Sequence, residues 1–543
     1  MYINFSDIPG NNNLFLDYLY EFENVKKFYK INFRDKDEYL KTFQRVSNSH
    51  DHSREALSQT LKEQYQGFNP SAKTQKNISA LADKKTLAVV TGQQLGILGG
   101  PLYTFYKLMT AIKLSTFLSE RYDDYYFVPV FWLEGDDHDF NEVRTINFLN
   151  DNNEIAQISY GQAVEDEEEN KGSIGNLKLN EALDQFYTDL EKNLRVTEFT
   201  PQIFEKIKSF YNSGKTFKEA FKELLFWMFD QYGLIIFDPQ DKNIKNLLKP
   251  IFKKEIADFR IHTEKLVKVS AELEEVYHAQ VKVRPVNLFY SNEEGRYLIE
   301  PVENEFRLKR KRKKFTLEEI LSHIESEPEK FSPNVLLRPI CQDYVLPTAF
   351  YVGGPSEISY FAQVMPLYDF YKVESPIIYP RSSATIIEKN INSIIEKFGI
   401  NLPELFIDPD KLKQKVIDSI SKTSVEEVFN KTSSQIELSF DQLKEKLFEF
   451  DKTISDVSSK YKEKIMKYLE ELKIKAYEAQ KRKHEITLRQ IERVVNVALP
   501  NSNLQEREIN FIYFANKYGI EIVNKVFEEL TINKFEHQII SLS

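Results

Sequence analysis

One segment of the chain has the order strand, glycine-rich turn, helix, strand. The apolar run 87–91 ends at Gly92, an amphipathic stretch covers 102–119 after Pro101, and a second apolar run covers 125–133. Continuous apolar runs indicate strands that are covered on both faces, as in a parallel sheet, and a helix tolerates proline in its first turn. Strands joined in this way are parallel and the crossover is right-handed. The sequence therefore predicts an α/β sheet.

The same order of elements returns later in the chain. Apolar runs at 234–237, 350–352 and 375–380 are each followed at once by turn residues, and the first two precede helical patterns. Strands that alternate with helices are typical of a doubly wound sheet. The strand-like stretches at 144–180 and 288–308 look like insertions into this sheet domain.

A heptad repeat marks the C-terminal part of the chain. Apolar residues alternate spacings of four and three from Ile436 to Tyr461, and a shifted repeat continues to Ala479. This is the pattern of a coiled coil with a stutter. We predict one helix of roughly 60 residues, about 90 Å long. Its apolar stripe needs a partner, which is either another subunit or the helix expected at 244–276.

These patterns divide the chain into eight segments. In chain order we expect an N-terminal mainly helical segment at 1–85, the first half of the sheet core at 86–143, an insertion of strands and then helices at 144–232, a core strand and long helix at 233–284, a second insertion at 285–330, the second half of the core at 331–400, a helical coiled coil at 401–499 and a C-terminal helical segment at 500–543.

Composition favours an ordinary globular protein in water. Hydrophobic residues make up 41% and charged residues 29% of the 543 residues, a typical balance. No apolar run approaches the ~18 residues that span a bilayer, and no export signal is visible, so we expect a cytoplasmic protein without membrane partners. The net charge of −10 gives no overall basic field for nucleic acid. One cysteine, Cys341, excludes an internal disulfide and a cysteine-rich metal site.

A basic run at 307–314 is the local exception to the acidic balance. Blocks of like charge usually face water, so the run is either a solvated loop or strand edge or a dock for an anionic substrate. The sequence alone leaves both interpretations open.

Two glycine-rich turns lie where ligands bind in open α/β sheets, at the carboxyl ends of strands. Free N–H groups at a helix start favour anions, and glycine lets a phosphate approach the backbone. Neither turn matches G-x-G-x-x-G or a P-loop, so no nucleotide is identified. The alternative is a plain turn or cap, with Ser356 capping its own helix. The candidate ligand-binding residues are Gly92, Gln93, Gln94, Gly99, Gly100, Tyr103, Lys107, Gly353, Gly354, Ser356 and Glu357.

An acidic segment at 134–142 directly follows the strand that contains Trp132. Its carboxylates cannot all be buried and charged, so they share protons, bind a cation or face water. One local histidine gives weak support for zinc, whereas magnesium carried by a nucleotide is possible. The proton-transfer interpretation makes His138 a general base held by an aspartate, and the alternative is a helix cap at Asp136 or Asp137. The candidate catalytic residues are Asp136, Asp137, His138 and Asp139.

Further polar residues follow other apolar runs. Leu336 and Leu337 read as a strand that leads into Arg338, which could bind a carboxylate bidentately or pair with Asp343. Gln342, Asp343 and Arg381 are further binding candidates. Trp132 belongs to the same predicted binding set. Cys341 reads as a small buried apolar residue rather than a nucleophile.

The motifs taken together resemble the bacillithiol biosynthesis cysteine-adding enzymes, the BshC family. One departure is Asp136, where the family often has glutamate, so a role that needs the longer side chain is in doubt. The matching segments run in family order over most of the chain: 91–94, 99–104 with Lys107, 128–132, 137–139, 337–339, 342–344, 346–347, 353–355, 357–358 with Tyr360, and 380–381.

The resemblance implies a Rossmann-like core with connecting-peptide insertions and a C-terminal coiled coil that forms a homodimer. It implies a ligase that joins L-cysteine to the amine of glucosaminyl-malate in the last step of bacillithiol biosynthesis. A carboxylate is a poor electrophile, so amide formation needs activation, most simply by ATP, and the amine must lose a proton. We expect no haem, flavin or iron–sulfur cluster. The alternatives are a nucleotide-binding coiled-coil scaffold and a metal-dependent hydrolase that uses residues 136–139.

Overall fold

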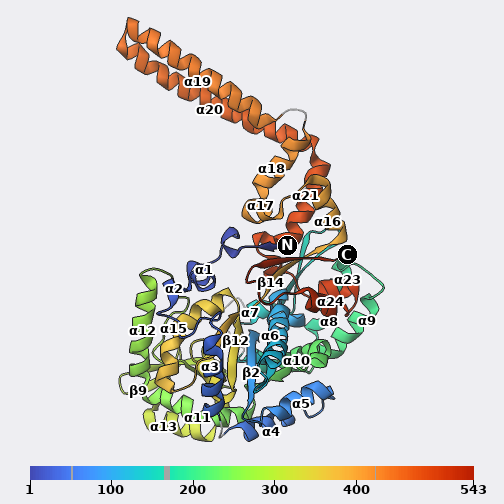
Figure 1. Ribbon diagram of the computed structural model, residues 1–543, viewed down its shortest axis with the longest axis vertical. Helices are drawn as coiled ribbons and strands as arrows, with labels where there is room; N and C mark the ends of the chain where they lie inside the picture. Colours follow the sequence, from blue (N-terminus) through green and yellow to red (C-terminus); the bar gives the residue numbers. More distant parts are fainter. Residues whose placement is uncertain (51–52, 138, 164–171, 422–423, 543) are drawn as a thin grey trace. The chain divides into compact units, whose positions relative to one another are not determined.

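The computed structural model describes residues 1–50, 53–137, 139–163, 172–421 and 424–542. The chain forms two compact units. The first comprises 1–385 and 501–540, and the second comprises 386–500 and the residues from 541 onward. Figure 1 shows the elements of both units along the chain.

A five-stranded parallel sheet is the centre of the first unit (Figure 1). Every neighbouring pair of strands is parallel, so the prediction of an α/β sheet is confirmed, and the five apolar runs are its strands. In spatial order they are β13 (Ile377–Pro380), β12 (Thr348–Gly353), β2 (Thr86–Gln94), β3 (Tyr126–Glu134) and β6 (Ile235–Phe237).

The helices that follow β2 and β12 leave the sheet in opposite directions. Helix α6 (Leu102–Arg121) leads from β2 to β3, and α15 (Pro355–Tyr371) leads from β12 to β13 on the other side of the strand order. Because such crossovers are right-handed, the two helices cover opposite faces of the sheet. The carboxyl ends of β2 and β12 therefore form the point where the strand order reverses, which is where ligands bind in doubly wound sheets.

Burial on both faces explains why the strands read as continuous apolar runs. Val130, Phe131 and Val352 are fully buried. Phe131 packs on a phenylalanine of α10 (Phe217–Phe229), and the ring of Phe43 on α3 (Asp37–Ser49) contacts β3 and β12. Each such side chain contributes about 1.5–3 kcal/mol through removal of apolar area from water.

The two predicted insertions form sheets of their own. Strands β4 (Thr145–Leu149) and β5 (Ile155–Ser159) pair antiparallel. A five-stranded antiparallel sheet is built in the order β10 (Lys314–Thr316), β9 (Glu305–Leu308), β8 (Gly295–Val302), β7 (Leu288–Asn292) and β11 (Phe331–Pro333). The basic run lies on β9, β10 and their connection, and Lys311 and Lys314 form ion pairs of 2.7 and 2.9 Å with glutamates of the same sheet. These contacts favour the solvated strand edge.

The two ends of the chain meet in the first unit. Much of the N-terminal segment is helical, with α1 (Asn13–Tyr20), α3, α4 (Arg54–Gln64) and α5 (Ala72–Ala80). The C-terminal segment was expected to be helical, but it ends in strand β15 (His537–Leu542), which pairs antiparallel with β1 (Tyr2–Ile3). Its β-branched isoleucines, Ile539 and Ile540, are buried in this sheet.

The strand expected around Leu336 and Leu337 is not formed. The backbone N–H groups of both residues donate to the Asn334 side chain at 2.9 and 3.1 Å, and helix α14 (Arg338–Val345) begins directly afterwards with a proline in its first turn. Periodicity cannot separate so short an apolar run from a helix start.

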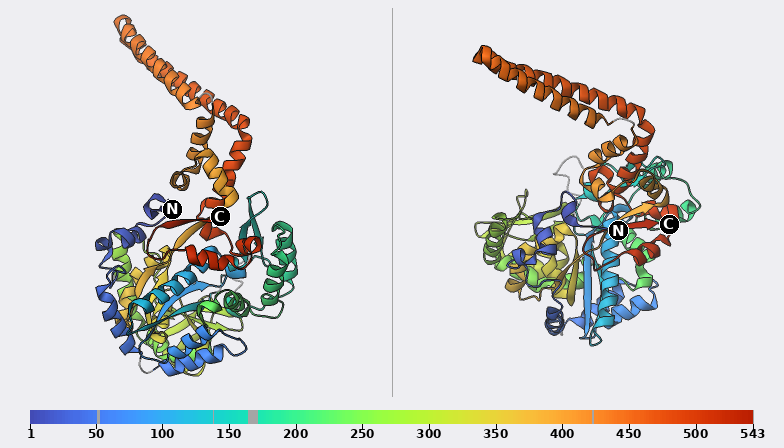
Figure 2. Two further views of the ribbon diagram at one scale, coloured as in Figure 1. Left: turned by 45° about the vertical axis from the view of Figure 1, so that its right-hand side comes forward. Right: turned by 45° about the horizontal axis from the view of Figure 1, so that its top comes forward.

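The second unit is mainly helical within its described residues, and its strand residues are the end of β14 (Ser383–Glu388) and the end of β15. Its α-helices are α16 (Lys389–Phe398), α17 (Leu402–Ile407), α18 (Pro409–Ile420), α19 (Val425–Phe450), α20 (Lys452–Lys483) and α21 (Glu485–Ala498). The three views in Figures 1 and 2 agree that α19 and α20 run side by side. The predicted coiled coil is therefore present as a helical hairpin.

The prediction of one helix of roughly 60 residues is wrong. Asp451 adopts extended backbone angles (φ −164°, ψ 129°), and its carboxylate accepts bonds from two N–H groups at the start of α20. Ion pairs of 2.8 Å (Lys462 with Asp441) and 3.1 Å (Lys473 with Glu426) join the two arms. The arms pair with each other, and the single helix expected at 244–276 is two helices of the first unit, α11 (Lys242–Ala257) and α12 (Phe259–Glu274).

Every helix among the described residues is too short or too polar to cross a lipid bilayer.

A core substitution checks the sheet packing. We expect Phe131→Ala to lower the free energy of unfolding by about 3–5 kcal/mol, because it leaves a cavity between β3 and α10. Phe117→Ala on α6, where the side chain is 49% exposed, should change it by less than about 0.5 kcal/mol. Urea titration followed by fluorescence measures both, and equal effects would contradict this packing.

Candidate functional site

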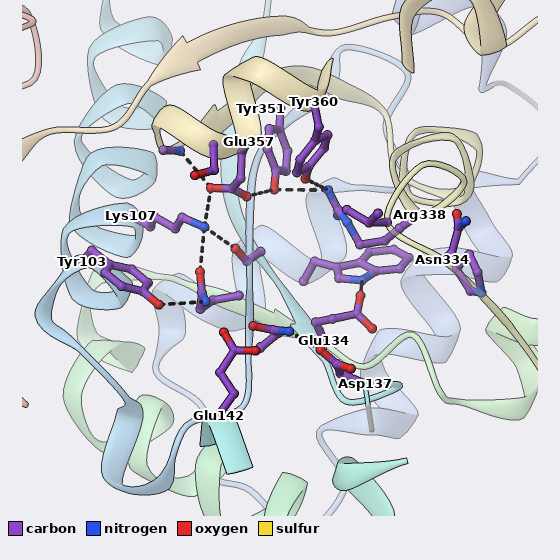
Figure 3. A pocket seen from close by; sticks show the side chains of 18 of the residues that line it. Tyr103, Lys107, Glu134, Asp137, Glu142, Asn334, Arg338, Tyr351, Glu357 and Tyr360 are labelled. Atoms are coloured by element: carbon purple, nitrogen blue, oxygen red, sulfur yellow. Dashed lines mark hydrogen bonds and ion pairs between the residues drawn. The ribbon is translucent and has the colours of Figure 1, made fainter. Parts of the chain in front are cut away.

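A cavity of about 530 Å³ opens where the strand order reverses (Figure 3). Its walls come from the ends of β2 and β3, the start of α6, and the N-termini of α14 and α15. The sequence-predicted residues that line it are Gly92, Gln93, Gln94, Tyr103, Lys107, Trp132, Asp137, Arg338, Gly354, Ser356, Glu357 and Arg381. Residues far apart in the sequence thus share one cavity.

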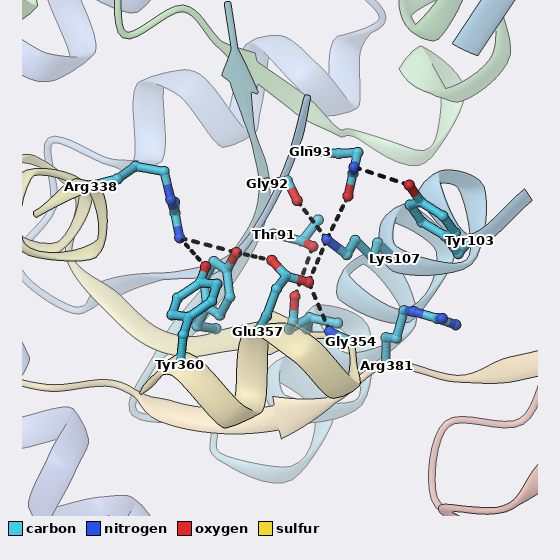
Figure 4. A network of polar contacts seen from close by, with 12 residues as sticks. Thr91, Gly92, Gln93, Tyr103, Lys107, Arg338, Gly354, Glu357, Tyr360 and Arg381 are labelled. Atoms are coloured by element: carbon cyan, nitrogen blue, oxygen red, sulfur yellow. Dashed lines mark hydrogen bonds and ion pairs between the residues drawn. The ribbon is translucent and has the colours of Figure 1, made fainter. Parts of the chain in front are cut away.

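A buried ion pair joins the two helices that start at this crevice (Figure 4). Lys107 of α6 pairs with Glu357 of α15, and its Nζ also donates to the Gly92 carbonyl at 2.9 Å and to Gln93 Oε1 at 2.8 Å. The Gly354 N–H donates to Glu357 at 2.8 Å. Burial alone would raise the pKa of Glu357, but Lys107 and this N–H outweigh it and hold the pKa below its usual value. Lys107 is therefore engaged within the protein.

Arg338 is a buried cation with neutral partners. Its guanidinium donates to Gln342 Oε1 at 2.8 Å and to the hydroxyls of Tyr351 and Tyr360 at 3.2 and 3.1 Å, and the residue is 7% exposed. Among the described residues it forms no ion pair. The charge of Glu134 acts on this guanidinium, but no carboxylate bonds to it directly. The guanidinium is therefore suited to bind an anionic ligand in the cavity.

Gln342 and Asp343 lie behind Arg338 and do not line the cavity. Gln342 donates to Asp343 at 2.7 Å, and Tyr368 donates to the same carboxylate at 2.5 Å. Burial raises the pKa of Asp343 to about 6. The interpretation of an ion pair between Arg338 and Asp343 is not supported, because Gln342 bonds to both; these two residues position Arg338.

The opposite side of the cavity is acidic (Figure 3). Glu134 accepts a 3.0 Å bond from the Trp132 indole, Asp137 accepts one from Gln94, and Glu142 lies beside them. Burial raises the pKa of Glu142, and the charges of Asp137 and Asp139 raise it further. Three carboxylates facing one space favour a cationic group or shared protons.

The other members of the acidic segment have different places. His138 lies outside the described residues. Asp139 caps the short helix α7 (Phe140–Val143) by accepting from the Glu142 N–H at 3.1 Å, so the cap is neither Asp136 nor Asp137. Asp136 does not line the cavity; it is buried against Lys245, 2.8 Å away, and Gln240, also 2.8 Å away.

The Gly99–Gly100 turn does not reach the main cavity. A Cβ at Gly96 would lie 2.7 Å from the Gly100 Cα, and Gly100 has φ +70°, so this turn needs glycine for its own close packing. Asn510 donates to the Gly100 carbonyl at 2.8 Å. Gly100 lines a second cavity of about 300 Å³, whereas Gly353 lines neither. The two glycine turns thus do not share a cavity.

Arg381 reaches the cavity wall from the end of β13. Its guanidinium forms a buried 2.7 Å ion pair with Glu506 and lies 5.6 Å from the ring centre of Tyr103. Other lining residues were not named as site residues from the sequence. Glu134 and Glu142 belong to the acidic segment, Tyr351 and Tyr360 lie on core elements, and the rest come from segments without a local motif: Phe289, Arg296, Asn334 and Arg507.

No three histidine, cysteine, aspartate or glutamate side chains come together as a metal site within the part of the chain that the structure describes. Cys341 is buried, and burial raises the pKa of its thiol, as fits a small apolar residue.

The fold and the cavity define a class: doubly wound α/β proteins that bind a ligand where the strand order reverses. Residues 1–382 match the family model described as bacillithiol biosynthesis BshC, N-terminal Rossmann-like domain, and residues 384–542 match the model described as its C-terminal coiled-coil domain. The chain belongs to the bacillithiol biosynthesis BshC family, as the motifs predicted.

Curated relatives agree over nearly the whole length. A protein of Salinibacter ruber is 32% identical over 535 residues, which cover 98% of this chain and 96% of that protein. A protein of Chloroherpeton thalassium is 35% identical over 543 residues, which cover 97% of this chain and 96% of that protein. Both carry the name "Putative cysteine ligase BshC".

Removing Lys245 tests how the acidic loop is held. We expect Lys245→Met to lower the free energy of unfolding at pH 7 by about 3–5 kcal/mol, because it leaves Asp136 buried without its cation. Lys249→Met on the same helix breaks a pair with the exposed Glu325 and should cost less than about 1 kcal/mol. Urea titration measures both.

The pH dependence of the stability that Lys245→Met loses gives a second check. Burial would raise the pKa of Asp136, but Lys245 and Arg296 hold it below its usual value. The wild-type stabilisation is therefore present at neutral pH and is lost only as the pH falls through this lowered pKa. In Lys245→Met the pKa of Asp136 rises, so Asp136 becomes protonated as the pH falls and the variant no longer buries an unpaired charge. The difference in free energy of unfolding between wild type and variant should therefore be smaller at pH 5 than at pH 7. A constant difference would contradict the pairing.

Proposed function

We propose that this protein is a ligase that forms an amide bond between the carboxyl group of L-cysteine and the amine of glucosaminyl-malate in bacillithiol biosynthesis. Family membership and the relatives' names support the reaction class. The observation that carries the proposal is the cavity itself, because buried Arg338 faces it from one side and three carboxylates face it from the other. Both substrates carry anionic groups as well as an amine.

The charges suggest how the substrates are oriented. Glu134, Asp137 and Glu142 suit an ammonium group, and a carboxylate whose pKa is raised by burial, as in Glu142, can accept the proton that the amine loses. Arg338 suits a carboxylate of the malate moiety. His138 is the second candidate for the base. In this arrangement the attacking nitrogen lies between the two charged sides.

Activation of the cysteine carboxylate by ATP, as an acyl-adenylate or acyl-phosphate, is part of the proposal. The start of α15 beside Arg381 is the part of the cavity that suits a phosphate, because helix-start N–H groups favour anions. The Gly99–Gly100 turn does not fit, because Asn510 and Ile509 occupy its neighbouring backbone groups. Magnesium would accompany the nucleotide; the described residues offer it no ready-made donor set.

Incubation of the purified protein with L-cysteine, glucosaminyl-malate, ATP and magnesium tests the reaction. We expect bacillithiol, detected as a labelled thiol by mass spectrometry, only when both substrates are present. Release of AMP or of ADP would separate the two modes of activation. No product with any nucleotide, while both substrates bind, would contradict the proposal.

Arg338 offers the sharpest variant for this reaction. We expect Arg338→Met to lower kcat/KM by about 100-fold, because a buried charge–charge contact is worth 2–5 kcal/mol and each 1.4 kcal/mol is tenfold. Arg338→Lys should retain only part of the wild-type kcat/KM, because lysine cannot bind a carboxylate bidentately. Arg260→Met, an exposed residue of α12 outside the cavity, is the control. Full activity of Arg338→Met would remove the anion-binding role.

We also propose a cytoplasmic location and a homodimer that forms through the hairpin. Its arms expose apolar side chains, among them Leu443 at 46%, Phe448 at 60% and Leu472 at 56%. Apolar patches of this kind mark association surfaces. Sedimentation velocity at micromolar concentration should show a dimer, and Leu443→Lys with Leu472→Lys should give a monomer. A monomeric wild-type protein would contradict this assembly.

A further inference from the structure

The chain returns to the first unit after the coiled coil. The family models assign 384–542 to the coiled-coil domain, yet residues 501–540 belong to the compact unit that holds the parallel sheet. Part of this returning segment, the short helix α22 (Gln505–Glu508), contributes Arg507 to the walls of both cavities. The segment is therefore part of the site, whatever the hairpin does.

Backbone and side-chain bonds fix α22 against the start of α6. The Leu102 N–H donates to the Ile509 carbonyl at 2.9 Å, and Asn510 donates to the Gly100 carbonyl at 2.8 Å. On the other side, Asn147 of β4 donates to Glu508 at 3.0 Å. The support of residue 507 is thus rigid on both sides.

The acidic neighbours of Arg507 are engaged elsewhere. Glu506 is buried, and its carboxylate accepts from Arg381 at 2.7 Å and from the Ala384 N–H at 3.0 Å. Glu508 accepts from three asparagines: Asn147, Asn501 and Asn503. Neither carboxylate neutralises the arginine between them.

The side chain of Arg507 differs from those of its two neighbours. Within the described part of the chain its guanidinium forms no ion pair and no side-chain hydrogen bond, although it stands beside Tyr103 and Glu142 on the wall that the two cavities share. In the same site Arg381 is neutralised by Glu506 and Lys107 by Glu357. Arg507 is therefore an exposed cation, held in place by its backbone, with its charge available to a ligand.

We propose that Arg507 binds an anionic oxygen group of a substrate, either a carboxylate or a phosphate, so that the segment after the coiled coil completes the substrate site. The inference rests on the proposed function, which supplies ligands of both kinds. Guanidinium is suited to either group because its planar fork donates two parallel hydrogen bonds. The position on the shared wall fits a ligand that extends from the main cavity towards the smaller one.

Titration calorimetry on the full chain tests this binding separately from catalysis. The probes are glucosaminyl-malate, L-cysteine and ATP with magnesium, each titrated into wild type, Arg507→Ala, Arg507→Lys and the control Arg493→Ala. Arg493 is an exposed arginine of α21 and lines neither cavity. We expect Arg507→Ala to weaken at least one of the three ligands by about 10- to 100-fold, as hydrogen bonds to charged groups predict. Arg507→Lys should lose less affinity than Arg507→Ala, and the control Arg493→Ala should keep the wild-type affinity.

The pattern of losses identifies the group. Weaker binding of glucosaminyl-malate would show that Arg507 contacts a malate carboxylate. Weaker binding of L-cysteine would assign it to the amino-acid carboxylate, and weaker binding of ATP to a phosphate. Unchanged affinities in Arg507→Ala, while wild type binds, would overturn this inference and leave the proposed ligase intact. Wild-type protein that binds none of the three would overturn both. An unfolded Arg507→Ala would also contradict it, because the side chain makes no internal bond to lose.

Discussion

The ion pair between Lys107 and Glu357 is the contact on which the site depends. It joins the second turn of α6 to the first turn of α15, two helices that cover opposite faces of the sheet. The lysine also holds the Gly92 carbonyl at the end of β2. A pair of buried charges without such additional bonds would cost more than it contributes. Here the bonds from Gly92, Gln93, Gly354 and Tyr351 satisfy both partners.

Charge is then distributed unevenly around the cavity. Lys107 and Arg381 are each in an ion pair with a carboxylate, whereas Arg338 and Arg507 form no ion pair with any described residue, and only the nearby charge of Glu134 acts on Arg338. Among the cavity carboxylates, burial raises the pKa values of Glu134 and Glu142. The charge of Asp136 raises that of Glu134 further, and the charges of Asp137 and Asp139 raise that of Glu142. A cavity that can attract a carboxylate at one side and an amine at the other is suited to a condensation between them.

The sequence predicted the parallel sheet well and the assembly of the site only in part. Buried strands such as β3 leave a plain signal, since both faces must be apolar. Many lining residues could be anticipated because they follow such strands directly, as Gln94 and Asp137 do. The roles of Asp136 and the Gly99–Gly100 turn could not, because their partners, Lys245 and Asn510, lie more than a hundred residues away. The break at Asp451 was missed because the heptad spacing continues without interruption from Phe450 to Ile454 across the aspartate that caps α20.

The place of the returning segment has a consequence for biosynthesis on the ribosome. Glu506, which neutralises Arg381, and Asn510, which bonds to the Gly100 carbonyl, are made only after the whole helical hairpin has been translated. Until the last 40 or so residues have been made, Arg381 has no carboxylate partner and β1 has no neighbouring strand. Because nascent chains fold as their segments become available, the newly made polypeptide acquires its finished cavity last, when strand β15 closes on strand β1.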